Sequence, residues 1–184
     1  MTEAEEDKTT TKWFAMRDLK RKNAKQPAYK MLGERGIEVF TPLTMEVIER
    51  RGKKSRKEVP VITDLLFVHT SREILDPIVA KTETLQYRFK RKAYCQPICV
   101  SEKEMNQFIQ AVSMNVTPPK YYRPEEITPE MLGKTVRIID GPLKDQEVRL
   151  QSVRGTRKRR ILVSLADYLV ASVEISPDLI QLLN

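Results

Sequence analysis

The 184-residue chain contains few cysteines and histidines, and these shortages exclude several kinds of site. Two cysteines and one histidine cannot complete the common four-ligand zinc sites, so we expect no metal and no cofactor. We interpret Cys95 and Cys99 as buried or half-buried free thiols of a protein from a reducing, cytoplasmic compartment. His69 follows an apolar run and is interpreted as a strand residue rather than a catalyst.

Long apolar runs and catalytic motifs are also missing. No stretch approaches the roughly 18 uncharged apolar residues that a membrane-spanning helix needs, so we expect no membrane contact. The glycine-rich phosphate-binding patterns and the G-x-S-x-G nucleophile pattern do not occur. No paired carboxylates are positioned to bind a catalytic metal, which argues against a nuclease. The sequence therefore predicts a protein that is not an enzyme.

Basic residues, by contrast, are abundant and clustered. Lys and Arg number 33 and Asp and Glu 25, for a net charge of +8. The clusters lie in residues 12–35, 46–58, 81–92 and 154–160. Clustered positive charge attracts polyanions, so we favour binding to nucleic acid or to a nucleic-acid machine. The alternative is that these side chains mainly keep the protein soluble.

The order of elements predicts an α+β protein with two folded parts. We expect a disordered acidic tail over residues 1–11, a first domain over 12–114, a Pro-rich linker over 115–129 and a second domain over 130–184. The first domain is expected to contain strands at 12–17, 37–48, 59–70, 85–92 and 98–100, with a charged hairpin tip at 49–56. Its helices are expected at 23–35, from Asp76-Pro77 to Lys81, and after the capping box Ser101–Glu104.

The second domain is expected to hold five short strands, a number that favours a small closed barrel. They cover residues 135–139, 147–153, 159–165, 168–175 and 179–183. Gly141 and Pro142 predict a tight turn after the first of them, with Gly141 at positive φ. Asp145 lies where a second left-handed residue is useful, and Asp tolerates that conformation better than most residues.

Several segments, taken in order, resemble one family. They are Trp13-Phe14-Ala15-Met16, Ile37–Pro42, the basic hairpin, Pro60–Val68 and the turn Gly141-Pro142-Leu143. Together they resemble the NusG-type transcription elongation factors over residues 12–184. The resemblance implies an N-terminal NGN domain, an antiparallel four-stranded sheet flanked by helices. It also implies a C-terminal KOW domain, an SH3-like β-barrel, and action as a monomer.

Other segments depart from the housekeeping members of that family. Ile62-Thr63-Asp64-Leu65 stands where they have a Phe-Pro-Gly-Tyr-like segment, and Asp145 stands where the KOW turn usually has glycine. Pro97–Val100 and Glu104-Met105 are closer to the specialised bacterial paralogues of the RfaH and UpxY type. The resemblance therefore implies an operon-specific antitermination factor for capsule-type polysaccharide operons.

The resemblance also implies contact residues on the first domain. The apolar residues implied to bind the clamp helices of RNA polymerase are Ile62, Leu65, Phe67, Met105 and Phe108. Those implied on the gate-loop side are Asp76, Pro77 and Ile78. The basic residues implied to contact phosphates of non-template DNA or nascent RNA are Lys20, Arg21, Lys22 and Lys25. The alternatives are that the apolar residues belong to the core and that the basic ones form a solvated face.

The second domain is implied to recruit ribosomal protein S10 or Rho. Its turn residues are Gly141, Pro142 and Asp145. Its basic loop contains Arg154, Arg157, Lys158, Arg159 and Arg160, a composition that suits RNA or an acidic protein. The competing hypothesis is a ribosome-associated RNA-binding protein of the KOW type, which would bind rRNA in a salt-sensitive way without binding polymerase.

Overall fold

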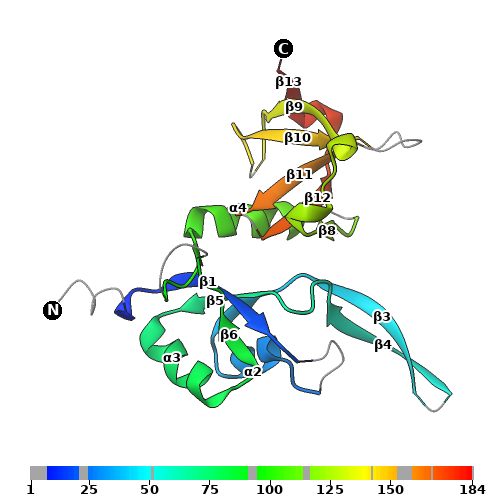
Figure 1. The fold of residues 1–184 in the computed structure, drawn as a ribbon. Helices are drawn as coiled ribbons and strands as arrows, with labels where there is room; N and C mark the ends of the chain where they lie inside the picture. The colour runs from blue at the N-terminus through cyan, green and yellow to red at the C-terminus, as the bar shows by residue number, and fades with distance from the viewer. Residues whose placement is uncertain are drawn as a thin grey trace. The chain divides into compact units, whose positions relative to one another are not determined.

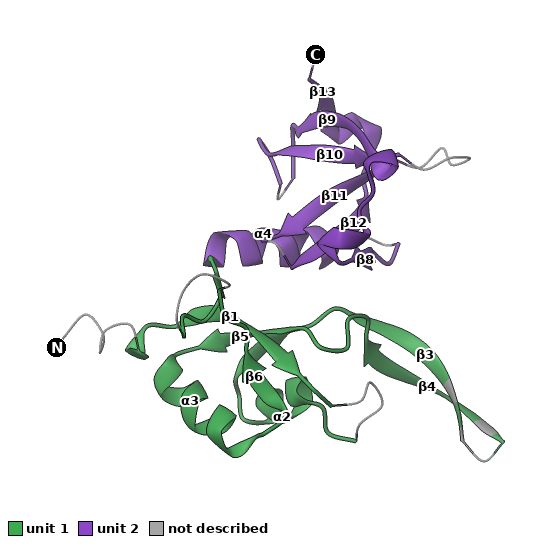
Figure 2. Ribbon diagram, viewed as in Figure 1, with its two compact units in different colours: residues 1–101 green, residues 102–184 purple. Residues whose placement is uncertain are grey.

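The structure is a computed structural model that describes residues 8–20, 25–50, 52–90, 95–113, 117–141, 143–152, 159–166 and 168–183. The chain divides into two compact units, residues 1–101 and 102–184, shown along the chain in Figure 1 and by colour in Figure 2. Among the described residues, no helix has the length and apolar character needed to cross a membrane.

An antiparallel sheet forms the centre of the first unit. Its strands are β2 (Glu38–Phe40), β5 (Leu66–Thr70), β1 (Lys12–Asp18), β6 (Leu85–Tyr87) and β7 (Cys99–Val100). The order is β2-β5-β1-β6, and β7 pairs with the start of β1. The expected four-stranded sheet therefore has a fifth, two-residue strand. Strands β5 and β1 both lie inside the sheet, which agrees with the apolar run of each strand.

Helices α2 (Ala28–Glu34) and α3 (Arg72–Lys81) pack on one face of this sheet. Because side chains alternate along a strand, Phe14, Met16, Leu66 and Val68 share the helix-covered face. This core cluster is completed by Ala28, Leu32, Leu75, Ile78 and Leu85. Trp13, Ala15 and Phe67 alternate with those residues and are also buried, so the sheet is apolar on both faces.

Helices α2 and α3 begin at positions that the sequence did not predict. Helix α2 begins at Ala28, with Pro27 at the N-cap, and Asn23, the first residue of the predicted helix, lies outside the described residues. Helix α3 begins at Arg72 with Ser71 at the N-cap. Pro77 lies inside this helix, so the predicted start at Asp76-Pro77 is wrong. Pro77 lacks one backbone N–H, and the side chain of Asp76 binds its neighbours instead of capping the helix.

Strands β3 (Leu43–Arg50) and β4 (Lys53–Pro60) form a separate two-stranded sheet. Their pairing runs without a break from Leu43 opposite Pro60 to Arg50 opposite Lys53. Because the pairing reaches Arg50 opposite Lys53, and Gly52 between them has φ +73°, the predicted tip at 49–56 is too long. Glu46 opposite Lys57 and Glu49 opposite Lys54 place opposite charges side by side, which supports strand pairing in a segment that reads as a charged loop.

The second unit contains helix α4 (Glu102–Ser113) and a six-stranded antiparallel sheet of order β13-β9-β10-β11-β12-β8. The strands are β8 (Lys120–Tyr122), β9 (Leu132–Ile138), β10 (Glu147–Gln151), β11 (Arg160–Leu165), β12 (Leu169–Glu174) and β13 (Ile180–Leu182). Three 3₁₀ turns, η1 (Pro124–Glu126), η2 (Pro129–Met131) and η3 (Pro177–Leu179), each begin with proline. Five strands match the predicted ones. Strand β8 lies in the predicted linker and pairs with β12, and the pairings among the described residues form an open path.

Helix α4 packs against β11 and β12 within the second unit. It begins directly after Ser101, as the capping box predicts, and it buries Met105, Phe108, Ala111 and Val112 on one side. Its apolar spacing explains this packing. The compact units thus separate before α4, whereas the predicted domain boundary follows residue 114. The predicted domain bounds stay a prediction, which limited proteolysis can test.

The turn between β9 and β10 has the backbone that the sequence predicts. Gly141 has φ +88° and Asp145 has φ +66°, and Pro142 lies outside the described residues. The Asp140 carboxylate accepts a hydrogen bond from the backbone N–H of Gly141 at 2.8 Å. The backbone N–H of Asp145 donates to the Ile138 carbonyl at 2.8 Å, which closes the turn onto β9.

Replacing Asp145 with glycine is expected to stabilise the second unit by about 0.5 kcal/mol, because glycine removes the strain of an L-residue at positive φ but adds freedom to the unfolded chain. Amide hydrogen exchange in β9 and β10 should slow accordingly. Replacing the exposed neighbour Lys144, which has no positive φ, with glycine is the matched control and should speed exchange. Faster exchange in the Asp145→Gly variant would contradict the prediction.

Candidate functional site

The apolar residues predicted to contact a clamp are buried and are divided between the two units. Ile62 and Leu65 lie in the segment 61–65 between β4 and β5, with 6% and 4% of their surfaces exposed. Phe67 follows in β5, and its ring lies 6.4 Å from that of Phe40. Met105 and Phe108 lie on α4 in the second unit. This burial agrees with the alternative that they are core residues, and contact with a partner stays a prediction.

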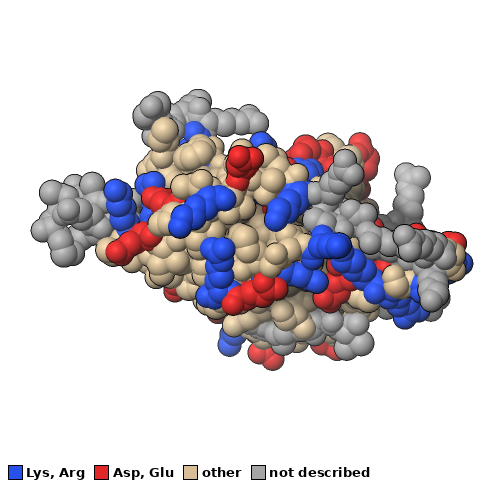
Figure 3. All heavy atoms as spheres, turned by 90° about the horizontal axis from the view of Figure 1, so that it is seen from below, with Lys and Arg blue, Asp and Glu red and all other residues tan. Residues whose placement is uncertain are grey.

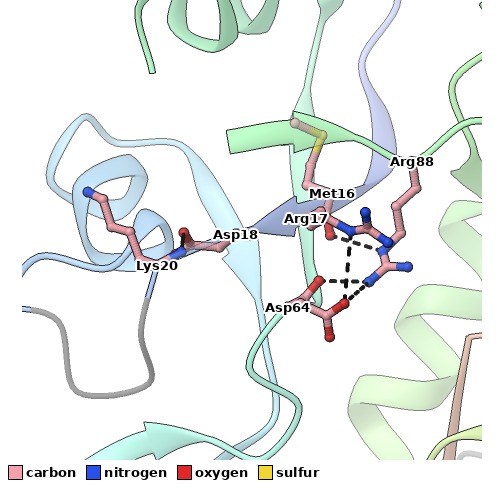
Figure 4. Close-up of polar contacts among 6 residues, drawn as sticks. All are labelled: Met16, Arg17, Asp18, Lys20, Asp64 and Arg88. Carbon is pink, nitrogen blue, oxygen red and sulfur yellow. Dashed lines mark hydrogen bonds and ion pairs between the residues drawn. The ribbon is translucent and has the colours of Figure 1, made fainter. Parts of the chain in front are cut away.

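A salt bridge with two carbonyl contacts holds the segment 61–65 to the sheet (Figure 4). Arg88 follows β6, and its Nη2 donates to the carbonyl oxygen of Asp64 at 2.8 Å and to Asp64 Oδ2 at 2.9 Å. Its Nε donates to the Met16 carbonyl at 3.4 Å, while Arg17 Nε lies 3.9 Å from Asp64 Oδ2. One guanidinium thus joins the end of β1 to the segment that carries Ile62 and Leu65.

Asp18, at the end of β1, fixes both ends of the first basic segment. Its side chain is 8% exposed, and Oδ1 accepts a hydrogen bond from the backbone N–H of Lys20 at 2.9 Å. Its Oδ2 accepts from the backbone N–H of Ala28, the first residue of α2, at 2.7 Å. The carboxylate therefore caps a helix from ten residues upstream, where it also meets the partial positive charge of the helix start.

The basic residues of this segment are partly described. Lys20 Nζ donates to the backbone carbonyl of Gln26 at 2.9 Å, and Lys25 is exposed. Arg21 and Lys22 lie outside the described residues. Figure 3 shows one face of the molecule, on which Lys and Arg side chains are spread and acidic side chains lie among them. Among the described residues seen on this face, basic side chains therefore do not form one continuous field.

The residues predicted on the gate-loop side have three different environments. Asp76 is half-buried, and its oxygens accept hydrogen bonds from Tyr87 Oη at 2.7 Å and from Arg72 Nη2 at 3.2 Å. Pro77 is exposed on α3, and Ile78 belongs to the core cluster. Asp76 therefore joins α3 to β6, and Pro77 is the residue of the three that a partner would reach first.

Burial, followed by the hydrogen bond to Asp76, raises the pKa of the Tyr87 phenol above its usual value of 10.0. Burial raises the pKa of Tyr121 to about 12. The folded protein keeps both phenols neutral at a pH where the unfolded chain releases their protons, so we expect stability to fall as pH rises above about 10. Chemical denaturation across this range measures the fall.

The Tyr87→Phe variant should show a weaker fall of stability above pH 10, and should lose about 1 kcal/mol at neutral pH because the Asp76 oxygen loses its donor. A slope above pH 10 equal to that of the unsubstituted protein would show that Tyr87 does not carry the effect.

Two arginines of the predicted basic loop are described, and they differ. Arg159 is exposed, whereas Arg160 Nε donates to Ser172 Oγ at 2.7 Å and its Nη2 donates to the Ser172 carbonyl at 2.6 Å. Ser172 is fully buried and donates to Gln151, so Arg160 belongs to the structure of the sheet. Arg154, Arg157 and Lys158 lie outside the described residues. Contact of this loop with RNA or protein stays a prediction.

The cysteines do not lie where they were expected. Cys95 and Cys99 are both exposed, which corrects the expectation of buried or half-buried thiols. Cys95 occupies a turn with φ +49°, and Cys99 lies on the short strand β7. Within the described ranges, no three His, Cys, Asp or Glu side chains are grouped so that they could hold a metal ion.

Asp18 and Arg88 are the structural residues that sequence reasoning missed. Asp18 ends an apolar strand and precedes a helix. Because ten residues separate it from Ala28, the sequence gives only a weak indication that it caps that helix. The contacts of Arg88 span 24 and 72 residues, and no local pattern predicts them.

Comparison with curated proteins gave no match. Among solved structures, the chain is similar to a NusG structure from Thermotoga maritima, described as showing domain interaction in that protein. The two share 15% sequence identity over 95% of this chain and 98% of the other, with a TM-score of 0.49. The family model described as transcription termination factor nusG matches residues 11–109, which run from the residue before β1 into α4. This match covers more than half of the chain, so the chain belongs to the NusG family of transcription factors.

Proposed function

We propose that the chain is an operon-specific transcription elongation and antitermination factor that binds RNA polymerase and suppresses pausing and termination. The family match over residues 11–109 is the observation that carries the proposal, since NusG-family factors bind RNA polymerase and are not enzymes. The operon-specific part rests on the segment Ile62–Leu65 and on Asp145, where the sequence departs from the housekeeping pattern. We place its action in the cytoplasm, as a monomer, on capsule-type polysaccharide operons.

The proposed domains are an NGN domain over residues 12–114 and an SH3-like KOW barrel over 130–184, joined by the linker 115–129. The six-stranded antiparallel sheet of the second unit supports a KOW domain. The positive φ angles of Gly141 and Asp145 in the turn between β9 and β10 support it further. Ribosomal protein S10 or Rho is the proposed partner of this domain.

The proposed polymerase contact is the apolar set Ile62, Leu65, Phe67, Met105 and Phe108, with Asp76, Pro77 and Ile78 on the gate-loop side. In such contacts a few anchor residues supply most of the binding energy. The hydrogen bonds of Arg88 to Asp64 support a fixed position for Ile62 and Leu65. The proposed contact with non-template DNA or nascent RNA is the segment of Lys20, Arg21, Lys22 and Lys25, which Asp18 holds at both ends.

Transcription by the cognate RNA polymerase tests the proposal, with one template carrying the operon leader and an unrelated control template. Readthrough on the operon template alone is the expected result. Equal readthrough on both templates would indicate a general NusG-like factor. No effect on either template, together with no binding to polymerase, would favour the ribosome-associated RNA-binding protein.

Two double variants test the contact surface. Because Ile62 and Leu65 are buried, charged substitutions would unfold the protein. The variant Ile62→Ala/Leu65→Ala is used instead, because it shortens both side chains without burying a charge. The matched control is Leu75→Ala/Leu85→Ala, which removes buried side chains from the helix-covered core cluster. We expect the first variant to lose binding to polymerase at a temperature where both are folded and the control binds. Equal binding by the two variants would exclude Ile62 and Leu65 from the contact.

A further inference from the structure

A cavity of about 270 Å³ opens on the first unit at the start of β1. Three cationic side chains line it, those of Lys12, Arg72 and Lys90. The amide of Gln96 and the thiol of Cys99 also line it, with Phe14 and Pro97 as apolar wall. No carboxylate is found among these lining residues, whereas acidic and basic side chains are mixed on the face seen in Figure 3.

A strand, a helix and a backbone hydrogen bond fix the main-chain positions of the three cationic residues. Lys12 is the first residue of β1 and pairs with Thr70. Arg72 is the first residue of α3, and Asp76 and the ring of Tyr87, 6.0 Å from its Cζ, orient its guanidinium. The backbone N–H of Lys90 donates to the carbonyl of Gln96 at 3.1 Å. The cations therefore come from three separate segments that the sheet brings around one cavity.

The charge at this cavity suits a phosphate group. Arg72 pairs with Asp76, and Lys12 and Lys90 add two further cations to the lining, whereas a phosphate monoester carries a charge of about −1.5 to −2 at neutral pH. Guanidinium and ammonium groups donate charge-assisted hydrogen bonds to phosphate oxygens, and an amide such as that of Gln96 can add a neutral one. The volume exceeds that of a phosphate ion alone, so a nucleotide unit fits the space better.

We propose that this cavity is a binding site for the phosphate of a nucleotide, either free or within a nucleic-acid chain. The site is distinct from the basic segment of Lys20 and Lys25. Lys12 begins β1 and Lys20 follows its end, so about seven residues of extended strand, roughly 20 Å, separate them. The proposal does not depend on whether the chain binds RNA polymerase.

Cys99 supplies a reporter for this site. Its thiol is exposed and lines the cavity, while Cys95 is exposed but does not line it. The rate at which iodoacetamide alkylates each thiol can be followed on the full-length protein by peptide mass spectrometry. The probes are inorganic pyrophosphate and a short oligonucleotide, each compared with sodium chloride of equal ionic strength. The chloride sample removes the general effect of salt on surface charges.

A bound phosphate should slow the alkylation of Cys99 and leave that of Cys95 unchanged. At a free probe concentration of about ten times its Kd, occupancy predicts slowing of about tenfold. Protection by the oligonucleotide alone would identify the phosphate of a nucleic-acid chain. Protection by pyrophosphate at the same concentration of phosphate groups would identify a free nucleotide or polyphosphate.

Two charge-matched double variants complete the test. Lys12→Gln/Lys90→Gln removes two cations of the cavity and should abolish the protection of Cys99. Lys54→Gln/Lys81→Gln removes two exposed lysines elsewhere on the same unit and should keep it. Fluorescence of the buried Trp13 verifies that both variants are folded. The proposal is overturned if no probe protects Cys99, if Cys95 is protected equally, or if the two variants behave alike.

Discussion

Replacing Asp18 with alanine is expected to lower the free energy of unfolding of the first unit by about 3 kcal/mol. The change removes the acceptor of two backbone N–H groups, those of Lys20 and Ala28, of which the second begins α2. Loss of a helix cap costs about 1–2 kcal/mol, and each hydrogen bond to a charged group contributes about 1.5–3 kcal/mol. The buried N–H of Ala28 is left without its partner, so the two losses add in part.

Fluorescence of the single tryptophan makes this measurement specific to the first unit. Trp13 is 2% exposed, and its indole ring stacks on His69 with centroids 4.7 Å apart. Urea unfolding followed at this residue should show a lower midpoint for Asp18→Ala. The midpoint of Asp18→Asn should lie between those of Asp18→Ala and the unsubstituted protein. The carboxamide oxygen of asparagine accepts a hydrogen bond from one of the two N–H groups, but its NH₂ group faces the other.

The control for this experiment is Glu83→Ala, which removes an exposed carboxylate from the same unit. Its midpoint should stay within about 0.5 kcal/mol of the unsubstituted protein, as is usual for surface positions. Similar losses in Asp18→Ala and Glu83→Ala would mean that net charge, rather than the two hydrogen bonds, determines the effect. Because Asp18 holds the segment of Lys20 and Lys25, the variant should also bind nucleic acid less tightly if that segment makes the contact.

The second large effect is expected for Arg88→Met, at about 2–3 kcal/mol. Methionine keeps an unbranched apolar stem of similar length but loses the donors to Asp64 and to the Met16 carbonyl. The side chain of Arg88 is 18% exposed and that of Asp64 28%, so solvent screens the pair in part, and the loss should fall below the 3–5 kcal/mol of a fully buried pair. Arg88→Lys keeps the positive charge but lacks the planar guanidinium group with its several donors. We expect its loss in free energy of unfolding to be about half that of Arg88→Met.

A double-mutant cycle separates the ion pair from the carbonyl contacts. The single variants Arg88→Met and Asp64→Ala are compared with the double variant, again by Trp13 fluorescence. A coupling free energy of about 1 kcal/mol or more is expected for residues in direct contact. Additive losses would show that Arg88 acts through the backbone carbonyls of Met16 and Asp64 and that the carboxylate contributes little.

The Arg88→Met variant also tests the proposed contact with RNA polymerase. Arg88 fixes the segment 61–65, so Arg88→Met should loosen Ile62 and Leu65 without removing either side chain. Binding to polymerase should then weaken at a temperature where the protein is still folded. Unchanged binding would indicate that this segment does not form the contact, even if the unfolding measurements follow the prediction.

Local patterns predicted the parts of the fold that depend on nearby residues. The apolar run after Lys12 predicted β1, and the capping box Ser101–Glu104 predicted the start of α4. Gly141 and Asp145 predicted the turn because positive φ is a property of single residues. Each of these features is determined within about ten residues of chain.

The errors occurred where a distant contact outweighed a local signal. Asp76-Pro77 is a good start for a helix, yet Asp76 binds Arg72 and Tyr87 and the helix begins a full turn earlier. Prolines around Lys120–Tyr122 indicated a linker, but these three residues pair with β12, about fifty residues later. Pairing across such distances is absent from a local reading of the sequence.

The sequence predicted a kind of partner for the candidate site, but not how the residues of the site are arranged. Clustered basic residues pointed to polyanions, and family resemblance pointed to polymerase, which the family match supports. Neither shows that Asp18 and Arg88 hold the two segments that carry the predicted contacts. Neither places Lys12, Arg72 and Lys90 around one cavity, since each belongs to a different strand, helix or loop.

The central place of β1 also determines when the first unit can fold during synthesis. Strand β1 precedes its partners β5, β6 and β7 in the chain, and these partners end only at Val100. At about 5–20 residues per second, the ribosome needs roughly 4–18 seconds to make the intervening chain. During that interval β1 lacks at least one of its native partners. The first unit therefore completes its sheet late: the core cluster around Phe14 and Met16 needs the chain up to Leu85, and the last pairing of β1 needs Val100.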